Sequence, residues 1–156
     1  MAARYDDGEI QARDLNILTR GLSGFVPQAV ATRGVTISIE TDRDAYDVGD
    51  TVDITVTIRN RIPFPIEVVT TGQRIWGWRV NDLLEASDET LYEPTTPRRF
   101  SMQARETITV DIEWDGRFKR DGSPTRWEPA DAGEHEIDVF LAVDPPKTDA
   151  KTVEFR

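Results

Sequence analysis

The side chains that most often carry chemistry are scarce in this sequence. Its 156 residues include a single histidine, His135, and no cysteine, so thiolate nucleophiles, thiolate metal ligands and multi-histidine metal sites are excluded. None of the serines stands in a Gly-x-Ser-x-Gly setting, and no Walker or Gly-x-Gly-x-x-Gly loop occurs. With 29 acidic residues, chance pairs of carboxylates are unavoidable, and a carboxylate-dependent hydrolase is the weakest alternative left open. We expect a protein that is not an enzyme and uses no cofactor.

Four aspartates gather around one turn of the sequence, at positions 42, 44, 47 and 50. Calcium needs several oxygen ligands that converge on one point, and Asp-x-Asp spacing supplies two of them. The distal glutamate of an EF-hand loop is missing, however. We interpret the group as an acidic turn and predict no metal site.

One segment concentrates basic and aromatic side chains. Between Asp115 and Ala130 it holds Arg117, Phe118, Lys119, Arg120, Arg126 and Trp127. In one interpretation this is a solvated hairpin whose arginines pair with nearby carboxylates, each pair contributing about 0.2–1 kcal/mol. In the other it is a recognition loop, because exposed aromatic and arginine side chains are frequent binding hot spots.

We take six residues as candidate contacts for a protein partner. Five lie on this predicted hairpin, and the sixth lies in the Pro63-Phe64-Pro65 turn: Arg117, Phe118, Arg120, Arg126, Trp127 and Phe64. Trp76 and Trp78 form a further aromatic pair on one face of a predicted strand, with Gly77 between them. We predict that both tryptophans belong to the core, and the alternative is an exposed pair that grips a partner.

The elements that must position these residues are strands. Apolar and polar residues alternate with period two from residue 34 onward, which is typical of half-buried antiparallel strands. Strands are predicted at 35–39, 52–58, 66–70, 74–80, 108–114, 137–141 and 152–155. Residues 83–98 are predicted to be irregular, because Pro94 and Pro97 exclude central-strand pairing. These features predict an all-β antiparallel sandwich of about seven to nine strands in residues 34–156.

Residues 1–33 differ from the rest and are predicted to form an N-terminal arm. The apolar residues of 9–19 allow a short helix, which Gly21, Gly24 and Pro27 would end. Docking of the arm on the domain, wrapping around a partner and mobility all remain open.

The charge is strongly acidic. The net charge is −10, with 29 acidic residues against 19 basic ones, and most of the basic residues are arginines. This composition is typical of cytosolic proteins of halophiles, in which dense salt screens the repulsion between like charges. An acidic mesophilic protein is the alternative. In both cases binding to nucleic acid is disfavoured, and no apolar run approaches membrane-spanning length, so a cytoplasmic location is expected.

His135 follows Asp131-Ala132-Gly133-Glu134 at the start of a predicted strand. Immunoglobulin-like domains often place a tyrosine in an equivalent Asp-x-Gly-x-Tyr arrangement, where its hydroxyl bonds to upstream backbone at the corner of the sandwich. We therefore predict that His135 is a structural corner residue.

An ordered set of short segments over residues 36–143 resembles the BsuPI-like intracellular proteinase inhibitors, which are small immunoglobulin-like β-sandwiches. The segments are Tyr46-Asp47-Val48-Gly49-Asp50, Asn60, Pro65-Ile66-Glu67-Val68, Thr71-Gly72-Gln73, Trp76, Val80-Asn81-Asp82, Trp114, Pro129 and Gly133. Together with the acidic composition, the resemblance suggests a haloarchaeal-type member. The sequence departs from the family pattern at His135, at Trp76-Gly77-Trp78 and in the additional arm.

The resemblance implies an intracellular, non-enzymatic module that binds proteins. An intracellular serine proteinase, inhibited through surface loops of the module, is the partner class that the family suggests. The alternative is a structural or adaptor subunit that the N-terminal arm anchors to a larger assembly.

Overall fold

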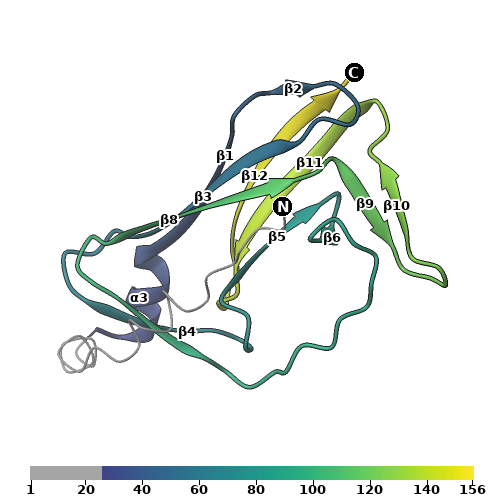
Figure 1. Cartoon of the computed structure of the whole chain (residues 1–156). Coiled ribbons are helices and arrows are strands. Elements are labelled where there is room, and N and C mark those ends of the chain that lie inside the picture. The colour runs from purple at the N-terminus through teal and green to yellow at the C-terminus, as the bar shows by residue number, and fades with distance from the viewer. Residues whose placement is uncertain (1–25) are drawn as a thin grey trace.

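The computed structural model describes residues 26–156, shown in Figure 1. The helix predicted for residues 9–19, and most of the predicted arm, lie outside the described residues. Within them the chain forms one short helix and twelve strands. The helix is α3 (Gln28–Gly34), and the strands are β1 (Val35–Thr41), β2 (Ala45–Tyr46), β3 (Val52–Asn60), β4 (Ile66–Val69), β5 (Trp76–Val80), β6 (Leu83–Leu84), β7 (Arg99–Met102), β8 (Thr107–Trp114), β9 (Arg117–Arg120), β10 (Arg126–Pro129), β11 (Gly133–Leu141) and β12 (Lys147–Phe155).

Two sheets pack face to face and enclose the core. One has the order β1-β3-β8 and the other the order β2-β12-β11-β5-β6. Side chains alternate between the two sides of a strand, so each sheet turns every second residue inward, as Ile54 and Ile58 do from β3 and Ile137 and Val139 do from β11. The predicted period-two pattern therefore matches the observed burial.

The fold is an all-β, immunoglobulin-like sandwich, as the sequence predicts. The number of strands exceeds the expected seven to nine, because β2, β6, β7, β9 and β10 add to the seven strands predicted. Pairing is antiparallel throughout the described sheets except between β2 and β12, which run parallel.

Beyond Asn60 the β3–β8 pair is followed by a separate two-stranded sheet, β4–β7, across a kink in residues 61–65. Asn60 is fully buried, and its side-chain amide donates to the carbonyl oxygens of Phe64 (2.9 Å) and Gln103 (2.8 Å). Its Oδ1 accepts the Ile62 amide at 2.9 Å. These three bonds satisfy a polar side chain whose burial would otherwise be costly, and they hold both sides of the kink together.

The short helix α3 lies against β4 (Figure 1). Ala31 of the helix is buried, and Gln28 donates from Nε2 to the Glu67 carbonyl oxygen at 2.8 Å. Residues 28–33 of the predicted arm are thus packed on the sandwich. None of the described helices is long and apolar enough to cross a membrane.

Trp76 and Trp78 are buried, 1% and 8% exposed, so the prediction that they belong to the core is confirmed and the exposed alternative is wrong. Gly77 faces the other side of β5, where a Cβ atom would come within 2.7 Å of the Phe140 ring. Phe140 therefore fills the space that the missing side chain leaves. The Arg79 guanidinium lies 4.8 Å from the centre of the same ring and pairs with Asp138 at 2.6 Å.

His135 occupies the corner that the sequence predicts. Its Nε2 lies 2.7 Å from the carbonyl oxygen of Asp131, four residues upstream, and its Nδ1 lies 2.9 Å from the Asn81 side-chain amide nitrogen. A carbonyl oxygen can only accept, so Nε2 carries the proton and Nδ1 accepts from Asn81. The ring also packs against Trp114 and Phe155, which gives His135 a structural role.

Candidate protein-binding surface

The predicted basic segment is a β-hairpin that projects from one end of the sandwich (Figure 1). Its strands β9 and β10 pair antiparallel, with Trp127 opposite Lys119 and Glu128 opposite Phe118. Residues opposite each other in an antiparallel pair share a face. Trp127 and Lys119 therefore lie on one face of the hairpin, with Arg117 two residues along, and Phe118 and Glu128 lie on the other.

Several bonds fasten the hairpin to the sandwich. The Trp114 indole donates to the Arg117 carbonyl oxygen at 2.8 Å, and the Ala130 amide donates to Gly116 at 2.8 Å. Lys119 exchanges backbone hydrogen bonds with Ala86 and Asp88, at the start of the long connection between β6 and β7. Hydrogen bonds therefore hold the hairpin both to the sandwich and to the connection between β6 and β7, so its exposed residues occupy defined positions.

Phe118 is only 6% exposed, which corrects its assignment as a partner contact. Its ring centre lies 5.5 Å from that of Trp114 and 6.0 Å from that of His135. The alternation within β9 turns Phe118 toward the core while its neighbours face solvent. The side chain anchors the hairpin and is not accessible to a partner.

Two basic side chains of the hairpin are paired, as the solvated-hairpin interpretation expects. Arg120 lies 3.0 Å from Glu128 and 3.7 Å from Asp88, and Lys119 lies 2.7 Å from Glu89. The hydrogen bond that Lys119 donates to the Glu89 carboxylate raises the pKa of Lys119. Arg117 and Arg126 are exposed and form no ion pair with another described residue. Of the predicted contacts, these two arginines and Trp127 remain available.

Trp127 is the dominant apolar feature of the hairpin, at 55% exposed. The Lys119 ammonium lies 5.9 Å from the centre of its ring, within reach of a cation–π attraction. We call Arg117, Lys119 and Trp127 the hairpin patch. Arg126 lies beside it but faces the opposite side, since its register partner is Arg120.

The long connection adds two exposed apolar residues that the sequence analysis did not select. Leu91 is 48% exposed and Tyr92 is 93% exposed, and both closely follow Glu89, the ion-pair partner of Lys119. The sequence could have pointed to these two residues, because Leu91 and Tyr92 are the only large apolar residues between Ala86 and Pro94. Farther along, Glu93 binds Arg74 of the sandwich.

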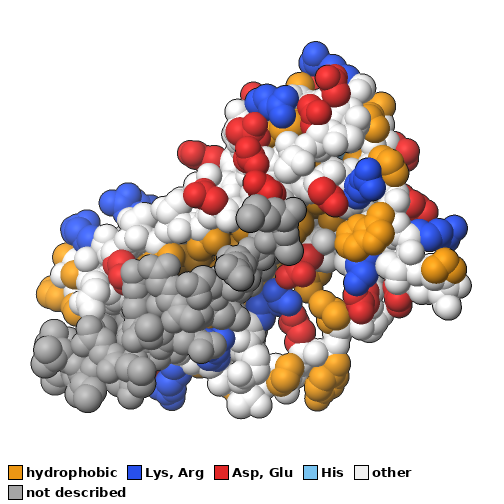
Figure 2. All heavy atoms as spheres, viewed as in Figure 1, with side chains coloured by type: hydrophobic (Ala, Val, Ile, Leu, Met, Phe, Trp, Pro, Cys, Tyr) orange, Lys and Arg blue, Asp and Glu red, His pale blue; other side chains and the backbone are white. Residues whose placement is uncertain are grey.

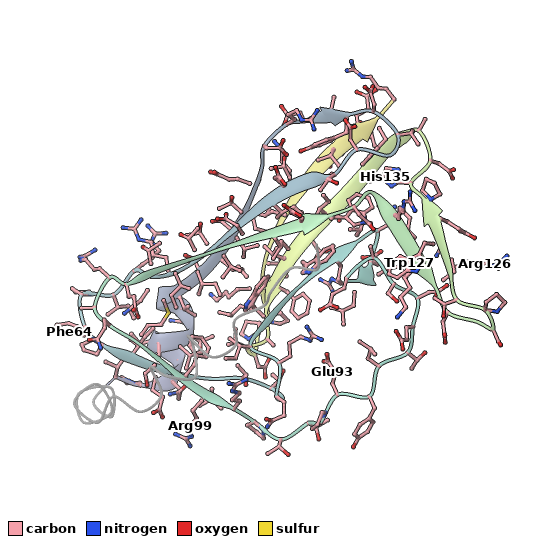
Figure 3. The ribbon with its side chains drawn as sticks, in the orientation of Figure 1. Phe64, Glu93, Arg99, Arg126, Trp127 and His135 are labelled. Carbon is pink, nitrogen blue, oxygen red and sulfur yellow. The ribbon has the colours of Figure 1, made fainter. Side chains whose placement is uncertain are left out.

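Phe64 does not belong to this surface. It is 60% exposed, but Figure 3 places it at one end of the molecule and Trp127 and Arg126 at the other. The structure therefore separates the predicted contacts into two sites, of which the hairpin patch is the larger.

The acidic turn is held together by hydrogen bonds within the protein. Asp42 accepts from the Tyr46 hydroxyl at 2.5 Å and from the Asp53 amide at 3.1 Å, and Asp50 accepts from the Asp47 amide at 3.1 Å. The Tyr46 hydroxyl lowers the pKa of Asp42, while burial and then the bond to Asp42 raise the pKa of Tyr46 to about 12. In residues 26–156 no group of three or more acidic or histidine side chains is arranged to hold a metal ion.

Comparisons with known proteins identify similar folds at low sequence identity. The CARDB domain of PF1109 from Pyrococcus furiosus is 13% identical, with a TM-score of 0.48 over 78% of this chain and 94% of that one. The sporulation control protein Spo0M from Bacillus subtilis is 14% identical, with a TM-score of 0.47 over 79% of this chain and 49% of that one. The β-glucosidase EmGH1 from Erythrobacter marinus is 11% identical, with a TM-score of 0.48 over 78% of this chain and only 15% of that one.

No curated protein matches the sequence. A family model does match, over residues 23–156, which include all twelve described strands. The chain therefore belongs to the family of unknown function DUF7974.

Proposed function

We propose that this protein is a non-enzymatic protein-binding module that contacts its partner through the hairpin patch. The observation that carries the proposal is the half-exposed Trp127, fixed on a well-anchored hairpin beside Lys119 and Arg117. Tryptophan and arginine dominate binding hot spots, because they bury a large area and offer directional donors. A tryptophan left this exposed on a monomer has no role in the core.

The patch suggests the chemistry of the partner. Arg117 has no ion-pair partner among the described residues, whereas the charge of Lys119 is already balanced by Glu89. A matching surface would offer an apolar pocket for the indole and one or two carboxylates for Arg117. The remaining surface of this protein is acidic, with a net charge of −10, so long-range repulsion disfavours partners that are acidic throughout.

The narrower form of the proposal is that the partner is an intracellular proteinase and that the hairpin blocks its active site in the cytosol. The resemblance to BsuPI-like inhibitors and the projecting shape of the hairpin support it. The absence of cysteine suits a reducing compartment.

The test begins with affinity capture by the full-length protein in concentrated potassium chloride, followed by identification of bound proteins. The captured partner is then titrated with wild-type protein and with Trp127→Ala. We expect affinity to fall at least tenfold, about 1.4 kcal/mol, because the truncation removes the central apolar contact.

Phe64→Ala is the matched control, because it removes another exposed aromatic ring from the far end of the molecule. Equal binding by wild type and Trp127→Ala, or loss of binding with Phe64→Ala alone, would refute the hairpin patch as the contact surface. If the partner is a proteinase, its activity is measured during the titration. If the proteinase keeps its full activity when it is saturated with this protein, the inhibitor form of the proposal is refuted and the binding role alone remains.

A further inference from the structure

A groove of about 370 Å³ lies on the solvent side of the β1-β3-β8 sheet, apart from the hairpin patch. Hydroxyl and guanidinium groups line it, and no carboxylate does. The lining residues are Thr36, Ser38, Thr57, Arg59, Arg61 and Arg105.

The strand register explains how these residues meet. Thr36 lies opposite Arg59, and Ser38 lies opposite Thr57, so all four side chains emerge on the outer face of the sheet. Arg61 follows the end of β3, and Arg105 precedes β8, the neighbour of β3. Pairing of β3 with β8 therefore brings Arg105 beside arginines that are distant from it in the sequence.

The three guanidinium groups are exposed, and none forms an ion pair with another described residue. Eight of the sixteen described basic side chains have a carboxylate partner, and the three groove arginines belong to the other eight. Like charges that line one groove repel one another, and a bound anion would relieve that repulsion.

The backbone fixes the arginines in place. The Arg61 amide donates to the Gly34 carbonyl oxygen at 2.8 Å, and the Arg105 amide donates to Ile62 at 3.0 Å. Arg105 has a φ of +53°, a left-handed conformation that glycine adopts without strain and arginine does not. This conformation belongs to the turn at residues 103–106, which the Glu106 amide closes by donating to the Gln103 carbonyl oxygen at 3.2 Å, and it fixes the direction in which the Arg105 side chain leaves the backbone.

We propose that the groove binds a small, soluble, multiply charged phosphate compound such as pyrophosphate or a sugar phosphate. Guanidinium groups match phosphate oxygens with paired N–H donors, and the three hydroxyls supply further hydrogen bonds to phosphate oxygens or to sugar hydroxyls. The lining contains no aromatic side chain, so it lacks the stacking surface that a nucleobase would use.

Charge elsewhere on the molecule favours a small ligand over an extended polyanion. On the same outer face, the far ends of β1 and β8 carry Glu40, Asp111 and Glu113. In Figure 2, basic side chains project at the end of the molecule near the β3–β4 and β7–β8 connections, acidic ones lie along the middle of the visible face, and both kinds occur at the far end. A membrane surface or a nucleic acid would meet these carboxylates as well as the arginines, whereas a compact phosphate would not.

The experiment is calorimetric titration of the full-length protein with sodium pyrophosphate, at a chloride concentration that keeps the protein folded. Arg59→Gln removes one guanidinium from a regular strand position. Arg105→Gly removes another and suits the left-handed backbone, so loss of folding does not obscure the result. Arg99→Gln is the control, because Arg99 is exposed and pairs with Glu67 on the separate two-stranded sheet β4–β7.

We expect saturable binding near one equivalent, and about a tenfold loss of affinity in each groove variant, equivalent to about 1.4 kcal/mol. Arg99→Gln should bind as the wild type does. Two further probes are vesicles of phosphatidylglycerol and a phosphoserine peptide. No binding of pyrophosphate, equal binding by the groove variants, or binding only to the vesicles or only to the peptide would each overturn the proposal.

Discussion

The β9–β10 hairpin and the groove on the β1-β3-β8 sheet both present basic side chains, but these side chains differ in how many form ion pairs. On the hairpin, Arg120 and Lys119 are held by Asp88, Glu128 and Glu89, and the exposed feature is an indole ring. In the groove, three arginines converge without a described ion-pair partner. The hairpin therefore combines an exposed indole ring with two paired and two unpaired basic side chains, whereas only hydroxyl and guanidinium groups line the groove.

This difference implies that the two surfaces respond differently to salt. Burial of apolar area is not weakened by screening, so binding through Trp127 should persist in concentrated salt. Attraction between guanidinium groups and phosphate is screened over about 10 Å at 0.1 M salt and should weaken. Comparing the two affinities across a salt series separates the surfaces even before any residue is changed.

The largest expected effect comes from Asn60→Ala, which would damage the groove and spare the hairpin. The change leaves the Ile62 amide and two carbonyl oxygens without their buried partner, at the kink that positions Arg59 and Arg61. We expect a loss of about 3 kcal/mol in the free energy of unfolding, measured by urea denaturation, and loss of pyrophosphate binding. Phe64→Ala, an exposed change in the same connection, should stay within about 0.5 kcal/mol of wild type. An Asn60→Ala loss no larger than this would show that the kink does not depend on the amide.

His135→Phe tests the opposite end of the molecule. Phenylalanine keeps the aromatic packing but leaves the Asp131 carbonyl oxygen and the Asn81 amide without a partner, so we expect a loss of about 2 kcal/mol by denaturation. Affinity at the hairpin should fall, because His135 packs under Phe118, while affinity at the groove should not change. Equal weakening at both surfaces would mean that the comparison does not separate two independent regions.

Tyr46 belongs to neither surface, and its titration should make the stability of the sandwich depend on pH. Its pKa is raised from about 10 to about 12 by burial and by the bond to Asp42. The folded state thus favours the protonated hydroxyl, so its contribution is complete below pH 10 and is lost as the pH rises toward 12. Thermal unfolding from pH 9 to pH 12 should show this loss in wild type and less of it in Tyr46→Phe. Identical profiles would exclude Tyr46 as the titrating group.

The smallest effect, and the most direct contrast between the surfaces, comes from removing one arginine from each. Arg120→Gln breaks two ion pairs on the hairpin and should reduce stability by about 0.2–1 kcal/mol. Arg59→Gln removes repulsion from the groove and should leave stability unchanged or slightly higher. The two variants are compared by thermal unfolding at low salt. A larger loss for Arg59→Gln would show that its guanidinium already has a stabilising contact in the free protein.

Much of the fold could be predicted from the sequence, because inward and outward residues alternate visibly in β1, β3, β8 and β11. β12 extends from Lys147, whereas only residues 152–155 were predicted as a strand. Its first residues show no apolar alternation, and only Val153 and Phe155 of the strand are buried. Pairing with β11 determines the rest of that strand, and such pairing cannot be inferred from a polar segment alone.

The two surfaces differed in how far they could be predicted. The hairpin surface could be predicted from the sequence because its basic and aromatic residues lie close together in the chain. The burial of Phe118 could not be predicted, because it depends on packing against Trp114. The groove could not be predicted from the sequence, because Arg105 comes near Arg59 and Arg61 only when β3 pairs with β8. Local composition detects the first kind of surface, and tertiary structure is needed for the second.

The long connection between β6 and β7 separates, along the chain, strands that pair with each other in the folded protein. Among the described residues, no backbone hydrogen bond joins 90–93 to the rest of the protein, and Tyr92 is almost fully in solvent. Strands on either side of this segment pair with each other as β3 with β8, β4 with β7, and β5 with β11. A chain divided here would yield two halves that complete each other's sheets, so the domain is suited to a split reporter whose reassembly restores the sandwich.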